Sequence, residues 1–162
     1  MTAGTAKWVL VGLCIWAAVA LRASPAMASH YRIELLEVFS AEQVEALLAL
    51  GIVTTEDFLS QAETREERAA LSQQAGISEM EVLVFARLCE LLQISGVGPR
   101  VAQLLRAAGV VSASDLASRD PVELTERLIA VNAVEQLTGI DPAVENVVAW
   151  IEDASRVPYH VE

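Results

Sequence analysis

Apolar residues recur along this chain with the period of an α-helix. Two segments place them at i, i+3, i+4 and i+7, the spacing of one helical face. These residues are Val101, Leu104, Leu105 and Ala108 in one segment, and Val144, Val147, Val148 and Ile151 in the other. Residues 79–93 are apolar almost all round, interrupted by Glu81, Arg87 and Glu90, which predicts a central helix packed on several sides. No segment competes as a strand, so we expect an all-α fold.

Polar residues typical of helix starts divide the chain into short helices. Capping boxes, in which a side-chain oxygen accepts amides of the first turn, are predicted at Ser40-x-x-Gln43, Thr54-x-x-Asp57 and Ser78-x-x-Glu81. Asp120-Pro121 and Asp141-Pro142 predict two further starts, because proline at the first helical position loses no hydrogen bond. Gly51 and Gly109 each follow an apolar helix and are predicted to end it in the left-handed conformation.

The same signals occur twice, at a constant offset of 58 residues. Leu36, Leu47, Gly51, Asp57 and Phe58 match Ile94, Leu105, Gly109, Asp115 and Leu116. Further along, residues 76–78 resemble residues 139–141 at an offset of 63, which indicates a five-residue insertion in the second half. We therefore predict two repeats, about 32–93 and 94–155, packed as one compact domain.

The first 28 residues have the pattern of a secretory signal peptide. Lys7 precedes an apolar run from Trp8 to Leu21, and an A-x-A cleavage site follows at residues 26–28. The alternative is an uncleaved anchor, although the run of 14 residues is shorter than the roughly 20 that span a bilayer. We expect export to the periplasm, the thylakoid lumen or the extracellular space, with a mature domain at residues 29–162 and no membrane span after cleavage.

Charge and cysteine content narrow the function further. Lys and Arg number 11 against 22 Asp and Glu, for a formal charge of −11, and removal of Lys7 and Arg22 would make it −13. This sign is opposite to that of a surface that neutralises phosphates, so a general nucleic-acid scaffold is disfavoured. Residues 29–162 contain one cysteine, Cys89, so no internal disulfide can form, and its apolar helical setting predicts a buried, unreactive thiol.

The most specific motif is Ile94-Ser95-Gly96-Val97-Gly98-Pro99-Arg100. Two glycines allow a tight turn in which Val97 points inward, while backbone amides face outward at the start of the next helix. Such a turn can hold a phosphate or another anion, so the candidate binding residues are Gly96, Val97, Gly98 and Arg100. The alternative is a sharp connection between two helices, which the conformational freedom of glycine explains by itself.

This motif looks like a helix-hairpin-helix, and both repeats together resemble an uncharacterised family of tandem helix-hairpin-helix units similar to that of DNA polymerase beta. The resemblance covers roughly residues 32–155. It implies a Gly-Ile-Gly-Pro type hairpin followed by a basic residue in the first repeat as well. Here those positions are Val38, Phe39, Ser40, Ala41 and Glu42, so both glycines are replaced and the basic residue is acidic. We expect that the first hairpin binds no anion.

Other chemistry finds little support. His30 and His160 lie near the two ends of the mature chain, with no cysteine or histidine at metal-ligand spacing, and no hydrolase or phosphate-loop motif occurs. We therefore expect no enzyme, no metal and no cofactor. The charged run at residues 63–68 is interpreted as a solvated helix face, and Trp150 as a core residue with an interface anchor as the alternative.

The sequence therefore predicts an exported, all-helical interaction or structural module whose helix-hairpin-helix scaffold has lost DNA-binding features, with a protein as its partner. The alternative is an exported, non-specific nucleic-acid-binding protein that uses the second hairpin. Acidity and the altered first hairpin favour the former.

Cleavage of the signal peptide predicts a mature protein that begins at Ser29, because small residues occupy both positions read by signal peptidase. N-terminal sequencing of the exported protein checks this. Recovery of the intact chain from Met1 to Glu162 in the membrane fraction would instead support an anchor.

Overall fold

The computed structural model describes residues 30–36, 38–157 and 161, so the predicted signal peptide at residues 1–28 lies outside the described part of the chain. Its elements are η1 (Ile33–Leu35), α1 (Ala41–Ala49), α2 (Thr55–Leu59), α3 (Arg65–Ala75), α4 (Glu79–Leu91), α5 (Pro99–Ala107), α6 (Ala113–Ala117), α7 (Pro121–Glu135) and α8 (Val144–Ala154). The described residues form no strand, apart from a single antiparallel bridge between Arg32 and Thr54. The all-α prediction is confirmed.

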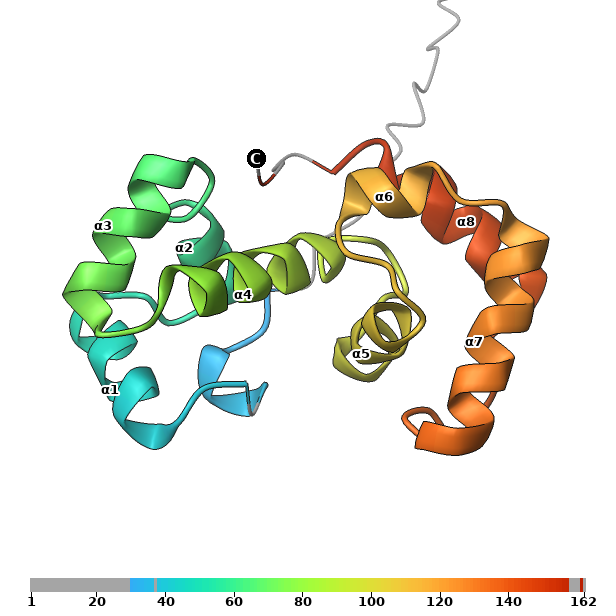
Figure 1. Cartoon of the computed structure of the whole chain (residues 1–162), viewed down its shortest axis with the longest axis horizontal. Coiled ribbons are helices and arrows are strands. Elements are labelled where there is room, and N and C mark those ends of the chain that lie inside the picture. The colour runs from blue at the N-terminus through green and yellow to red at the C-terminus, as the bar shows by residue number, and fades with distance from the viewer. Residues whose placement is uncertain (1–29, 37, 158–160, 162) are drawn as a thin grey trace, which may run out of the picture.

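Helix α4 lies across the middle of the fold, with α1–α3 at one end and α5–α8 at the other (Figure 1). It packs against α2 and α3 on one side and against α5 and α6 on the other. Phe85 of α4 lies edge-on to both Phe39 and Phe58, with ring centroids 4.5 and 4.6 Å apart. The predicted central helix is therefore correct, and its side chains form the middle of the core.

Most predicted helix starts are confirmed. Complete capping boxes are present at Ser40, Thr54 and Ser78, and a further one that we did not predict joins Thr64 to Glu67. Asp120 caps α7 by accepting the amides of two residues of its first turn. Both glycines predicted to end helices are left-handed, with φ of 79° at Gly51 and 91° at Gly109.

The start predicted at Asp141-Pro142 is wrong. Helix α8 begins at Val144, and its N-cap, Ala143, offers no side-chain oxygen. Asp141 accepts a hydrogen bond from the amide of Asn132 in α7 instead, at 2.8 Å. Its carboxylate therefore fixes the loop between α7 and α8, because a contact outside the helix replaces the cap.

The buried face of α8 also differs from the predicted one. Val147 is fully buried, but Val148 is 37% exposed, while Trp150 and Ala154 are buried. The buried positions therefore follow i, i+3 and i+7 from Val147, and the large indole ring takes the place that we assigned to Val148 and Ile151. The favoured interpretation of Trp150 as a core residue is confirmed.

The charged run at residues 63–68 is not simply a solvated face. Arg68 is only 6% exposed, and its guanidinium donates to the carbonyl oxygens of Ala62 and Glu63 at 3.0 and 2.6 Å. These carbonyls lie in the turn between α2 and α3, where no helix provides them with a donor. Spacing alone could not reveal this role, because the turn folds back onto the first turn of α3.

Substitution of Arg68 by Met should lower the free energy of unfolding by about 1–3 kcal/mol, because two carbonyl oxygens lose their donor at a buried site. Chemical denaturation measures this change. Arg65→Met is the matched control in the same helix, since Arg65 is exposed, and it should change stability by less than about 0.5 kcal/mol. Equal effects of the two variants would contradict the assigned role.

Candidate functional site

The candidate anion-binding turn connects the end of α4 to the start of α5. Gly96 is left-handed with φ of 81°, and Val97 is 2% exposed and donates its amide to the carbonyl of Ile94 at 3.0 Å. Gly98 is the N-cap of α5 in an extended conformation, with φ of −86° and ψ of 176°, and Pro99 opens the helix. The inward position of Val97 is thus confirmed, whereas only the first glycine adopts a conformation that requires glycine.

Two aromatic side chains from distant parts of the chain approach this turn. A Cβ atom on Gly96 would lie 3.2 Å from Nε1 of Trp150 in α8, and one on Gly98 would lie 3.6 Å from the hydroxyl of Tyr31. The close approach of Trp150 explains a second requirement for glycine at residue 96, because a side chain would displace the indole ring. The turn is therefore held from the C-terminal helix as well as by its own backbone.

The start of α5 lacks a side-chain cap. Gly98 makes no capping hydrogen bond, and Arg100 is exposed in the first turn of the helix. Unsatisfied amides and the helix dipole favour an anion at such an end. The structure therefore brings Gly96, Val97, Gly98 and Arg100 together in one turn, with Arg100 as the nearest cation.

The corresponding turn in the first half has a different structure. Ser40 occupies the position of Gly98 and accepts the amide of Gln43, whose side chain accepts the Ser40 amide in return. Phe39 takes the inward position of Val97 and packs against Phe85. Glu42 is exposed where the second half has Arg100. A side-chain cap thus already uses the amides that an anion would need.

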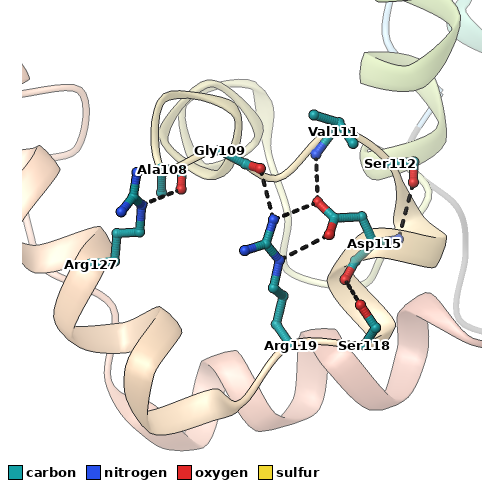
Figure 2. A network of polar contacts seen from close by, with 8 residues as sticks. All are labelled: Ala108, Gly109, Val111, Ser112, Asp115, Ser118, Arg119 and Arg127. Atoms are coloured by element: carbon teal, nitrogen blue, oxygen red, sulfur yellow. Dashed lines mark hydrogen bonds and ion pairs between the residues drawn. The ribbon is translucent and has the colours of Figure 1, made fainter.

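A polar network fixes the turn after α5 (Figure 2). Arg119 donates to both carboxylate oxygens of Asp115 at 2.9 Å and to the carbonyl of Gly109 at 2.9 Å. Asp115 also accepts the amide of Val111, and Arg127 donates to the carbonyl of Ala108 at 2.6 Å. Two arginines of the second half therefore bind the C-terminal end of α5, where cations oppose the helix dipole favourably.

This network shifts the titration of Asp115. Partial burial alone would raise the pKa of its carboxyl, but the hydrogen bonds from Arg119 and from the Val111 amide outweigh burial and leave the pKa below its ordinary value. In the first half, hydrogen bonds from Thr54 lower the pKa of Asp57 in the same way. Both carboxylates therefore hold turns in place at neutral pH.

A buried acid, Glu90, was missed as a site residue because we treated it as an interruption of an apolar helix. It is 1% exposed in α4, and its carboxylate accepts the amides of Ala113 at 3.2 Å and Val161 at 3.4 Å. Its neighbour Cys89 is fully buried, which raises the pKa of the thiol well above its ordinary value. The prediction of a buried, unreactive thiol is confirmed, and Glu90 serves to join α4, α6 and the C-terminal segment.

Two absences concern the described residues alone. Within them, no three side chains of His, Cys, Asp or Glu gather as ligands for a metal ion. No helix among them is both long and apolar enough to cross a bilayer.

The two glycines of the candidate turn should respond differently to substitution. Gly96→Ala should lower the free energy of unfolding by about 1–3 kcal/mol, because a left-handed alanine is strained and its Cβ meets Trp150. Gly98→Ser should leave stability unchanged or raise it by a few tenths of a kcal/mol, since serine is a good N-cap in an extended conformation. Thermal and chemical denaturation measure both values, and equal losses would contradict this asymmetry.

Comparison with known proteins places the chain in a family. No curated protein and no solved structure matches the sequence. The model of a domain of unknown function, DUF4332, matches residues 37–157, a segment that contains α1 through α8 and the candidate turn. Because this match covers more than half of the sequence, the protein belongs to the DUF4332 family.

Proposed function

We propose that this protein is an exported interaction module, built from two diverged helix-hairpin-helix repeats, whose partner is a protein rather than DNA. The observation that carries the proposal is the capping box of Ser40. It uses the amides of the first hairpin within the chain, and an acid, Glu42, stands where DNA binding calls for a cation. Clamping a duplex backbone usually engages both hairpins, so this scaffold is poorly suited to it.

Matching hydrogen bonds in the two halves support the duplication. The amide of Ile52 donates to Leu47 at 3.0 Å, and 58 residues later Val110 donates to Leu105 at 2.9 Å. The amides of Val53 and Val111 likewise donate to carboxylates, those of Asp57 at 3.1 Å and Asp115 at 2.9 Å. Two unrelated halves have no reason to share these bonds at one offset.

The use of arginine supports the absence of DNA binding. Arg68, Arg119 and Arg127 donate to backbone carbonyls, and Arg32 and Arg156 pair with nearby carboxylates. Arg100 and Arg106 remain exposed on α5, but they lie six residues apart and do not share a helical face. The chain thus presents few cations to a polyanion.

A second candidate function is non-specific nucleic-acid binding through the second hairpin. The uncapped start of α5 beside the exposed Arg100 favours it. Repulsion between the acidic protein and DNA is screened beyond about 8 Å at physiological salt, so a local contact at this turn would not be prevented.

Fluorescence anisotropy with labelled single- and double-stranded DNA across a salt series separates the two functions. At physiological salt we expect a Kd at or above about 10⁻⁴ M, the weak end for non-specific binders. Arg106→Ala is the matched control for Arg100→Ala, since both residues are exposed on α5. Low-micromolar binding that weakens with salt and is lost only in Arg100→Ala would favour the second candidate.

In-cell cross-linking followed by affinity capture and mass spectrometry tests for the protein partner. We expect one specific cross-linked protein from the compartment that receives this chain. Recovery of nucleic acid, or of no cross-linked protein at all, would contradict the proposed function.

A further inference from the structure

Helix α1 presents an apolar face away from the core. Leu47 is fully buried, whereas Leu48 is 36% exposed. Ala41, Val44, Glu45 and Leu48 lie at i, i+3, i+4 and i+7, so they form one stripe along the helix. This stripe lines a groove of about 530 Å³ together with Glu34 and Phe39. We call these six residues the α1 groove.

The floor of the α1 groove is held by the core. Phe39 lies partly buried, with its ring centroid 4.5 Å from that of Phe85 and 6.1 Å from that of Phe58. Both of those rings are fully buried and cannot move without disturbing α2 and α4. A surface fixed in this way binds a partner with little cost in ordering its own side chains.

The rim of the α1 groove is acidic. Glu34 and Glu45 line it, and Glu42 is exposed one turn before Glu45. The sequence of α1 contains no basic residue. Arg32 donates to Glu34 at 2.6 Å, which leaves Glu42 and Glu45 as the carboxylates that no basic side chain among the described residues contacts.

Shape and charge together identify the kind of partner. The described residues have no strand whose edge an extended peptide could join, whereas a straight stripe with i, i+3 and i+7 spacing fits the ridge of another helix. A second copy of this chain would bring its own acidic rim against the first. Complementarity to an apolar floor and an acidic rim therefore requires an apolar and basic helix.

We propose that the α1 groove binds a basic amphipathic helix of the protein partner, a statement that rests on the proposed interaction function. Apolar residues of that helix, one turn apart, pack on Phe39, Val44 and Leu48. Lysine or arginine side chains beside them pair with Glu45 and Glu42. The first repeat thus binds protein at the side where a second-repeat hairpin has Arg100.

Selection of displayed helical peptides against the protein, isolated as its cells produce it, tests this proposal. We expect enriched peptides that carry apolar residues at i, i+3 or i+4 and i+7, flanked by lysine and arginine. Leu48→Glu should weaken their binding at least tenfold. Val111→Glu is the matched control, since Val111 is an exposed valine, 56% accessible, in the second half, and this change should leave binding unaltered.

A charge exchange tests the rim separately from the floor. Glu45→Lys should weaken binding of the basic peptides, and replacing their basic residues with glutamate should restore it. Thermal denaturation of each variant verifies that it is folded, and Glu45 and Leu48 are both exposed enough for their substitutes to reach solvent.

Several outcomes would overturn the proposal: no enrichment, enriched peptides without the helical pattern or without basic residues, or binding that is lost in Val111→Glu but not in Leu48→Glu. In each case weak DNA binding and a cross-linked protein partner would leave the proposed function standing. Tight, Arg100-dependent DNA binding would instead remove the proposed function itself.

Discussion

Burial of α4 from two sides is the constraint on which the rest of this fold depends. Phe85 faces the first half, where it contacts Phe39 and Phe58, and Glu90 faces the second half, where it accepts the amide of Ala113. Aromatic pairs of this kind contribute roughly 0.5–1.5 kcal/mol beyond the area they bury. Because one helix provides core to both ends of the molecule, neither half has a complete interior without it.

This shared helix also explains why an acid is buried in an apolar helix. In the first half the amide of Thr55 donates to the carbonyl of Tyr31 at 2.9 Å. The matching amide in the second half belongs to Ala113, and the matching carbonyl, at Cys89, lies inside α4 where helical bonds already use it. The carboxylate of Glu90 replaces that carbonyl as acceptor. A helix in place of an extended segment therefore requires a side-chain oxygen.

Local chemistry was readable from the sequence, and tertiary contacts were not. The capping residues Ser40, Thr54 and Ser78 act within three residues of themselves, so spacing alone predicted them. The buried face of α8 and the role of Arg68 depend on which surface or turn folds back against them, and no short-range pattern records that. The same distinction divides the candidate site: the turn and the inward Val97 were predicted, whereas the aromatic contacts from Tyr31 and Trp150 come from residues far away in the chain.

The indole of Trp150 over Gly96 has a spectroscopic consequence. The other two tryptophans of the chain, Trp8 and Trp16, precede residue 29, so a chain that begins there has one intrinsic fluorophore, placed against the hairpin. Its emission would report the state of this turn alone, with no dye attached. A ligand at the second hairpin would change that emission, and one bound on α1 would leave it constant, so a single optical signal distinguishes the two faces.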